Sequence, residues 1–357
     1  MQKGLHYFDY LGLDKILSAQ ELESDKFNKH AHDEMLFIIT HQAFELWFKQ
    51  VLFDVDSVIS LLSQQFVPEK DISICYQRMG RVKQILTFVT GQFEILETMT
   101  PLNFTDFRNF LNPASGFQSF QFRLLETKLG LPNDTRVNKH FENALKTEDL
   151  QLLESARNSH SLFSAIEQWL ENMPFLQLNT YSFSEEYKQT LLAMIEKDKE
   201  YAKELIESPE EYEKRIQQID QLKESFLSLF DETLYQKHIE EGSRRLSFKA
   251  TQAYLFISLY ADFPLLQLPF LLLQTVIEVD NALSVWRYHH FKMVSKMIGR
   301  KIGTGGSSGS DYLLRTVSAQ RVFDDLGSLA SFLVARDTIP TLPEEIAHQL
   351  RFAYEIK

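Results

Sequence analysis

The chain has 357 residues, of which 44% are hydrophobic, and its formal net charge is −12. This hydrophobic content suffices for a substantial core and argues against disorder, while the acidic charge disfavours nucleic acid as a partner, since phosphate recognition needs a basic surface. Cys75 is the only cysteine, which excludes a disulfide framework and thiolate-ligated zinc or iron–sulfur sites.

Apolar residues recur at three- and four-residue spacing along most of the chain, as in amphipathic and buried helices. The sequence lacks the alternating β-branched runs that mark strands. We therefore expect an all-α fold, a helical bundle in a single domain over residues 1–357. The predicted helices span residues 33–62, 72–99, 118–129, 149–172, 184–207, 210–241, 247–260, 266–299 and 318–334.

The first long predicted helix carries a histidine on an aromatic face. Residues 32–49 are apolar nearly all round, which is typical of a helix in the centre of a bundle. Phe37, His41, Phe44 and Phe48 fall on one side of this helix. A histidine in such a slot can offer one hydrogen bond to a bound molecule. Taken alone, the pattern is more typical of a core than of a site.

The segment 98–123 sets Arg108 and Arg123 among aromatic and aliphatic residues. A buried guanidinium needs an anionic partner, because desolvation of an unpaired charge is costly. A carboxylate of a bound molecule would match the planar guanidinium with two parallel hydrogen bonds. An internal ion pair with a nearby Asp or Glu is the alternative, and composition leaves both open.

Residues 184–245 are rich in Glu, Lys and Gln around a narrow apolar stripe. This predicts a charged helical hairpin inserted into the bundle, turning at Ser208 and Pro209 and facing solvent rather than a partner.

The most apolar run, residues 253–276, is interrupted by Asp262, Pro264, Gln267 and Pro269. Such a run suits a buried helix-turn-helix better than a membrane span. Because residues 1–6 also lack the apolar stretch of a signal peptide, we expect a cytoplasmic protein with no membrane segment.

The predicted helix 266–299 carries the strongest ligand candidate. His290 shares a helix face with Trp286, Met293 and Met297, whereas His289 is turned about 100° away. The glycine-rich loop 303–309 follows and could close over a molecule held by His290. A core histidine is the alternative reading. If His290 is a ligand, a lone axial histidine favours haem over a multidentate metal centre.

Together these segments closely resemble the tryptophan 2,3-dioxygenase family from about residue 7 to about residue 340, most densely over 7–22, 32–50, 97–130 and 244–317. The resemblance implies a homotetramer of two dimers, with one iron-containing haem b per subunit. It also implies cleavage of the indole C2–C3 bond of L-tryptophan by O₂ to N-formyl-L-kynurenine, the first step of the kynurenine pathway. An oxygenase of a related indole and a non-catalytic haem sensor are the alternatives.

The resemblance further implies roles for individual residues. On the haem side, His290 matches the iron ligand, with Trp286 one helical turn away, and Ser115 and Arg123 match residues that line the haem and its propionates. On the substrate side, His41 matches the histidine that accepts the indole N–H, and Phe37 matches the wall of the indole slot. Arg108 matches the arginine that binds the substrate carboxylate, and Thr304 matches the loop threonine at the ammonium and carboxylate end. Tyr7 matches a tyrosine that a neighbouring subunit contributes to the site.

Overall fold

The computed structural model describes residues 4–133, 142, 145–178, 181–299 and 309–351. Over these residues the chain is helical apart from loops and one two-stranded antiparallel sheet, β1 (Gln177–Leu178) with β2 (Tyr181–Ser182). The all-α fold expected from the sequence is confirmed. The chain forms two compact units, the first of residues 1–56, 81–159 and 279–322 and the second of residues 57–80, 160–278 and 323–357. The single domain over residues 1–357 stays a prediction.

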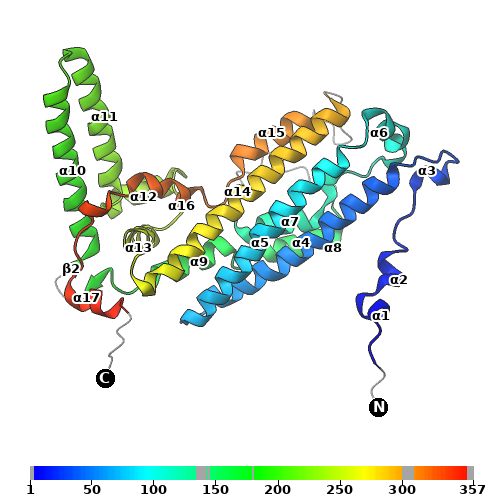
Figure 1. The fold of residues 1–357 in the computed structure, drawn as a ribbon, viewed down its shortest axis with the longest axis horizontal. Coiled ribbons are helices and arrows are strands. Elements are labelled where there is room, and N and C mark those ends of the chain that lie inside the picture. The colour runs from blue at the N-terminus through cyan, green and yellow to red at the C-terminus, as the bar shows by residue number, and fades with distance from the viewer. Residues whose placement is uncertain (1–3, 134–141, 143–144, 179–180, 300–308, 352–357) are drawn as a thin grey trace. The chain divides into compact units, whose positions relative to one another are not determined.

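The first unit contains segments of the long helices labelled in Figure 1. It includes parts of α4 (Glu34–Leu62), α5 (Glu69–Leu96) and α14 (Pro264–Ile298). Its shorter helices are α1 (Tyr7–Leu11), α2 (Leu13–Ile16), α3 (Glu23–Lys26), α6 (Pro101–Arg108), α7 (Phe120–Leu129), α8 (Thr147–Arg157), α15 (Gly309–Ala319) and the 3-10 turns η1 (Asn109–Leu111) and η2 (Gly116–Gln118).

Aromatic rings from four helices form the core of the first unit. Phe44 of α4 lies 5.3 Å from Phe93 of α5 and 6.1 Å from Trp286 of α14, measured between ring centroids. Phe122 of α7 packs on the same indole at 4.8 Å. Each such ring contributes about 1.5–3 kcal/mol by leaving water, so this cluster fixes the four helices around the site.

The second unit contains the buried helix α13 (Phe248–Leu259), which packs against α9 (Leu162–Glu171). Its other elements are α10 (Phe183–Leu205), α11 (Pro209–Ser228), α12 (Glu232–Glu240), α16 (Asp324–Ser328), α17 (Glu344–Gln349) and the 3-10 turns η4 (Leu329–Phe332) and η5 (Arg336–Thr338).

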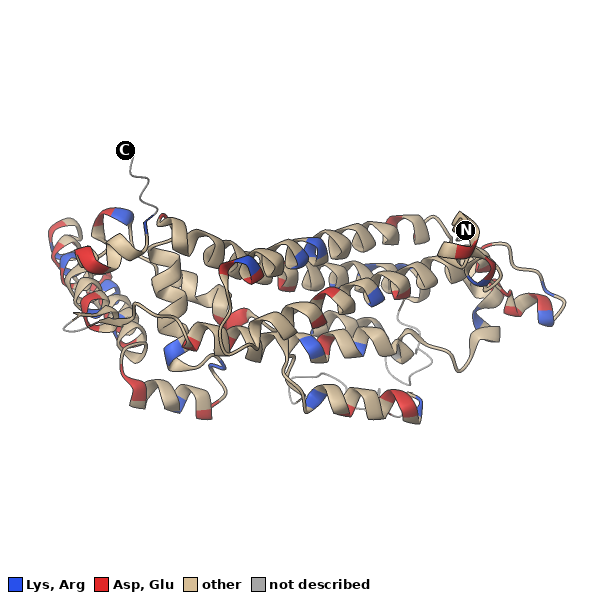
Figure 2. Cartoon of the chain, turned by 90° about the horizontal axis from the view of Figure 1, so that it is seen from below, with Lys and Arg blue, Asp and Glu red and all other residues tan. Residues whose placement is uncertain are grey.

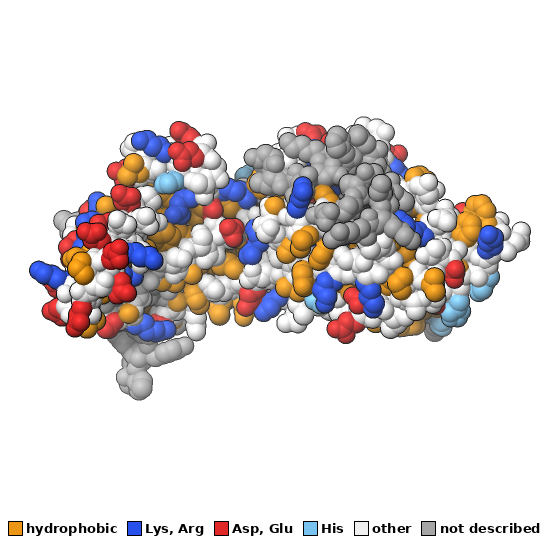
Figure 3. All heavy atoms as spheres, turned by 90° about the horizontal axis from the view of Figure 1, so that it is seen from above, with side chains coloured by type: hydrophobic (Ala, Val, Ile, Leu, Met, Phe, Trp, Pro, Cys, Tyr) orange, Lys and Arg blue, Asp and Glu red, His pale blue; other side chains and the backbone are white. Residues whose placement is uncertain are grey.

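Helices α10 and α11 lie side by side as a hairpin (Figure 1). Ser208 caps α11, its hydroxyl accepting from the Glu211 backbone N–H, and Pro209 is the first helical residue. Acidic and basic residues are interspersed along the pair (Figures 2 and 3). An ion pair between Lys199 and Asp220, 2.7 Å apart, joins the two helices. The narrow apolar stripe noted in the sequence lies between them, with Ile195 and Ile219 buried.

Two of the predicted helices are interrupted where a polar side chain caps a new helix. In 149–172 the chain leaves the helix after Arg157, and Ser161 starts α9 by accepting from the Ser164 backbone N–H at 3.2 Å. In 210–241 the break lies at 229–231, where Asp231 accepts from the Leu234 backbone N–H at 3.0 Å. Apolar spacing continues across both breaks, so periodicity alone misses them.

The predicted helix 318–334 is wrong. Helix α15 ends at Ala319 and α16 begins only at Asp324. Between them the backbone N–H of Val322 donates to the Asp280 carboxylate at 3.0 Å, so a side chain from α14 takes a donor that a continuous helix would need.

The apolar run 253–276 forms the predicted helix-turn-helix, with the turn at residues 260–263 and Pro269 inside α14. Among the described residues, α14 alone is long and apolar enough to cross a membrane by length and composition. Core side chains such as Leu272, Val276 and Leu283 are buried on this helix.

Candidate functional site

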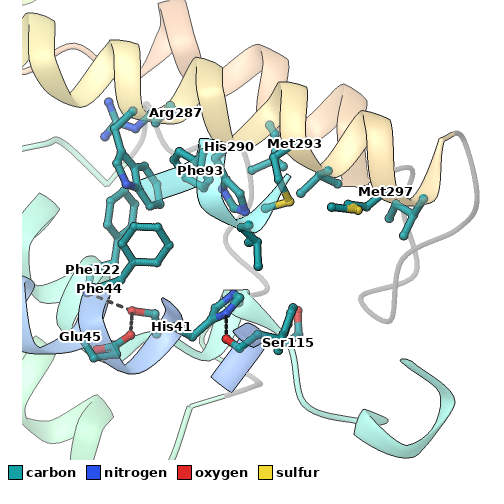
Figure 4. Close-up of a pocket in the computed structure, with 18 of the residues that line it drawn as sticks. His41, Phe44, Glu45, Phe93, Ser115, Phe122, Arg287, His290, Met293 and Met297 are labelled. Carbon is teal, nitrogen blue, oxygen red and sulfur yellow. Dashed lines mark hydrogen bonds between the residues drawn. The ribbon is translucent and has the colours of Figure 1, made fainter. Parts of the chain in front are cut away.

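A cavity of about 270 Å³ lies within the first unit, lined by α4, α5, α6, α7, α14 and α15. Figure 4 shows His41 on one side of this space and His290 on the other. Aromatic, aliphatic and sulfur-containing side chains make up most of the lining, which gives a largely apolar slot. These side chains include Phe37, Phe44, Phe48, Phe93, Phe104, Phe122, Met293 and Met297.

His41 has a defined protonation pattern. Its Nδ1 lies 2.7 Å from the carbonyl oxygen of Phe37, one turn earlier in α4. A carbonyl only accepts, so Nδ1 carries the proton and Nε2 keeps its lone pair. Burial lowers the pKa of His41 and keeps the ring neutral at neutral pH. His41 can therefore accept one hydrogen bond through Nε2.

His290 is held among rings on the α14 side of the cavity. Its ring centroid lies 5.2 Å from Trp286 and 5.8 Å from Phe93, the latter stacked. Burial, together with smaller contributions from the nearby His41 and Arg123, lowers the pKa of His290 to about 4. At neutral pH the imidazole is neutral, the form that binds metals.

Trp286 and Arg287 bring buried N–H groups to the same wall. Both line the cavity and are buried, and within the described residues neither the Nε1 of Trp286 nor the Nε of Arg287 has a hydrogen-bond partner. An unpaired buried donor costs about 1–3 kcal/mol. An acceptor bound in the cavity would offset that cost for any donor it reaches.

Arg123 forms the internal ion pair that the sequence left open. Its Nη1 lies 3.0 Å from one carboxylate oxygen of Glu126, one turn later in α7. The other oxygen of Glu126 lies 3.0 Å from Nη2 of Arg287. Arg287 also donates through Nη1 to the backbone carbonyl of Gln320 at 2.7 Å. Two buried arginines thus share one buried carboxylate at the cavity wall.

The structure brings together most of the residues singled out in the sequence. Arg108, the last residue of α6, and Ser115 line the cavity and are half-buried. The shared lining includes Phe37, His41, Arg108, Ser115, Arg123, Trp286 and His290. Tyr7 of α1 is outside this lining and 71% exposed. Thr304 and the predicted loop up to residue 308 lie outside the described residues.

The sequence reasoning missed Phe93, Glu126 and Arg287. Helical spacing held a signal for two of them, since Glu126 follows Arg123 by three residues and Arg287 precedes His290 by three. Phe93 sits in an ordinary apolar helix pattern, and nothing local distinguishes it from a core residue.

The fold and the cavity define an all-helical protein with a ring-lined internal site that has a neutral histidine on each of two sides. The family model described as tryptophan 2,3-dioxygenase matches residues 1–333. The protein named tryptophan 2,3-dioxygenase from Bdellovibrio bacteriovorus is 43% identical over 98% of this chain and 99% of its own length. The protein of the same name from Dictyostelium discoideum is 42% identical over 99% of this chain and 90% of its own length. The protein of that name from Rattus norvegicus is 42% identical over 99% of this chain and 87% of its own length. The chain belongs to the tryptophan 2,3-dioxygenase family.

Proposed function

We propose that this protein is a haem-dependent dioxygenase that cleaves the indole C2–C3 bond of L-tryptophan with O₂ and releases N-formyl-L-kynurenine. Family membership along nearly the whole chain supports the activity. The structural observation that carries the proposal is the pair of neutral histidines, His41 and His290, that line one ring-walled cavity. One suits a metal ligand and the other a hydrogen-bond acceptor for substrate.

The residues around the cavity fit haem b. Its aromatic walls suit a flat macrocycle, and neutral His290 can bind the iron. Arg123, Ser115 and the unpartnered N–H of Trp286, within the described part of the chain, offer donors for the propionate carboxylates. When bound, haem would supply the activation of O₂, while the protein orients the substrate and excludes water.

The opposite side of the cavity suits L-tryptophan. The Nε2 of His41 would accept the indole N–H, and the ring of Phe37 would form a wall of the indole slot. Arg108 would bind the carboxylate with two charge-assisted hydrogen bonds, and Thr304 would contact the ammonium and carboxylate end. When both ends of the substrate are fixed, binding also holds C2 and C3 of the indole in one position for reaction. His41 need only retain the indole proton in a hydrogen bond and is not required as a base.

Phe104 lies at the carboxylate end of the proposed substrate site. Its ring centroid is 5.7 Å from Phe37 and 5.4 Å from Phe107. A tyrosine at this position would carry a hydroxyl able to donate to the substrate carboxylate. Phenylalanine cannot make that hydrogen bond, so Arg108 and Thr304 would carry the recognition.

A homotetramer, in which Tyr7 completes a neighbouring subunit's site, is part of the proposal. Large apolar side chains that are exposed on this chain support it, since burial against further copies would remove them from water. They lie at the N-terminus and on α4 and α5, and include Leu5, Tyr7, Tyr10, Leu17, Ile39, Leu46, Phe53, Phe88 and Ile95. A cytoplasmic location is also proposed, and fractionation of cells that express the protein tests it.

Product analysis of the reduced, haem-loaded protein with L-tryptophan and ¹⁸O₂ tests the function. We expect N-formyl-L-kynurenine carrying both labelled atoms. A product with the indole ring intact would instead identify an oxygenase of another type, and haem binding without any product would identify a sensor.

A further inference from the structure

The charge of the cavity lining is opposite in sign to that of the chain. Among the described residues, the lining contains three arginines and two glutamates, one positive charge in excess, although the whole chain carries −12. Two of the arginines, Arg123 and Arg287, are 7% and 3% exposed, and Glu126 between them is 1% exposed. In this weakly screened interior their charges act over longer distances than surface charges do.

Glu126 is the common partner of both arginines. Each of its carboxylate oxygens lies 3.0 Å from one guanidinium, that of Arg123 on the same helix or that of Arg287 on α14. The formal charges of the two guanidinium groups exceed that of the carboxylate by one. The three groups together therefore hold a net charge of +1 at the cavity wall.

This triad is in contact with the residues that hold His290. The guanidinium carbons of Arg123 and Arg287 lie 5.8 Å and 6.0 Å from the centroid of the Phe122 ring. Phe122 packs on Trp286 at 4.8 Å, and Trp286 packs on His290 at 5.2 Å. The charged triad is therefore separated from the proposed iron ligand by two packed rings, Phe122 and Trp286. Along α14, Arg287 is also only one helical turn from His290.

We propose that Arg123, Glu126 and Arg287 form a triad that sets the balance between iron(II) and iron(III) in the bound haem, with Glu126 as the positioning residue for both arginines. This inference rests on the proposed function. Iron(III) haem carries one more positive charge than iron(II) haem, so a fixed positive charge at the cavity wall favours the reduced state. Net charge and burial around a haem are known determinants of its reduction potential.

The reduction potential of the haem-loaded protein, measured by spectroelectrochemical titration, tests the triad. Glu126→Gln removes a negative charge and keeps the shape, so the potential should rise. Arg287→Met removes a positive charge and keeps much of the volume, so the potential should fall. Simple loosening of the cavity would shift both variants in the same direction, because both would admit water.

Two control variants separate the effect of the triad's charge from the effect of substituting an arginine. Arg287→Lys keeps the charge and should stay closer to the wild-type potential than Arg287→Met. Arg321→Met removes an arginine that bonds Asp280 of α14 outside the cavity lining, and it should leave the potential unchanged. If Glu126→Gln does not load haem, Arg123→Met takes its place and must lower the potential, as Arg287→Met does.

The outcomes distinguish this inference from the proposed function. A wild-type protein that binds no haem would overturn both. A wild type that binds haem and oxidises tryptophan, while the Glu126 and Arg287 variants shift the potential in the same direction or leave it unchanged, would overturn the inference alone.

Discussion

Toward the cavity, the His41 ring can act only as an acceptor, because its Nδ1 proton is committed to the carbonyl of Phe37. A neutral acceptor opposite the proposed haem ligand suits a substrate that offers one N–H group. The Nε2 lone pair serves either a hydrogen bond or proton abstraction, so substitution of His41 is needed to distinguish the two roles.

His41→Ser should therefore weaken catalysis without abolishing it. The lost hydrogen bond is worth about 0.5–1.5 kcal/mol, so kcat/KM for L-tryptophan should fall by about two- to twelvefold. 1-Methyltryptophan has no indole proton to donate, and it should be a poor substrate for wild type that loses little more in the variant. If His41→Ser were completely inactive with haem and substrate still bound, the residue would instead be an essential base.

Arg108→Leu should raise KM steeply and lower kcat, because the proposed carboxylate contact both binds and aligns the substrate. Loss of a charge-assisted pair of hydrogen bonds costs about 2–5 kcal/mol. Tryptamine, which lacks the carboxylate, should be turned over poorly by wild type and be indifferent to the substitution. Steady-state kinetics with both compounds measure this, and equal turnover of the two by wild type would exclude the clamp.

Among the elements, α9 owes its separate existence to a capping box. The hydroxyl of Ser161 accepts from the Ser164 backbone N–H, and the hydroxyl of Ser164 accepts from the Ser161 backbone N–H at 2.9 Å. Because these contacts satisfy donors that the first turn leaves open, the chain can start a new helix after a gap of only four residues.

Ser161→Ala should lower the free energy of unfolding by about 0.5–2 kcal/mol. Thermal unfolding followed by circular dichroism measures the change, with Ser159→Ala as the control because Ser159 is exposed and its hydroxyl donates to the Ser155 carbonyl instead of capping a helix N-terminus. Equal effects of the two substitutions would show that the capping box contributes nothing.

How far the sequence predicts the elements depends on what ends them. Long buried helices such as α4, α5 and α14 follow from apolar spacing within a few residues. Interruptions set by side chains, as at Ser161 and Asp231, do not follow from apolar spacing, and the contact from Asp280 to Val322 joins residues far apart in the chain.

The candidate site is likewise predictable only in part. Phe37, His41 and His290 stand out by their neighbours, whereas the pairing of Glu126 with Arg287 needs the fold.

Buried tyrosines should make the second unit sensitive to alkali. Burial raises the pKa of Tyr187 and Tyr260, whose hydroxyls donate to the carbonyls of Phe332 and Pro340. An acid with a raised folded-state pKa keeps its proton longer in the folded than in the unfolded chain. Its contribution to stability is complete below the ordinary tyrosine pKa of about 10 and is lost as the pH rises further.

Urea unfolding at pH 8, 9.5, 10.5 and 11.5 measures this effect, and the free energy of unfolding should fall only above about pH 10. Tyr187→Phe, which cannot ionise, should flatten the dependence on pH even though it lowers stability at pH 8. A stability that is constant or rising above pH 10 would contradict the assignment.

For the whole molecule, function depends on bringing His41, near one end of the chain, and His290, near the other, to one cavity. The ring cluster of Phe44, Phe93, Phe122 and Trp286 does this by joining α4, α5, α7 and α14. The charged hairpin of α10 and α11 contributes no residue to the cavity lining.

The absorption spectrum of haem-reconstituted protein tests this arrangement most directly, with wild type, His290→Ala and His289→Ala compared with and without L-tryptophan. We predict a five-coordinate ferrous spectrum that responds to L-tryptophan in wild type and in His289→Ala. For His290→Ala we predict loss of stable haem binding with the helical circular dichroism of the apoprotein retained. A normal haem spectrum in His290→Ala, together with its loss in His289→Ala, would contradict the assignment of His290 as the iron ligand.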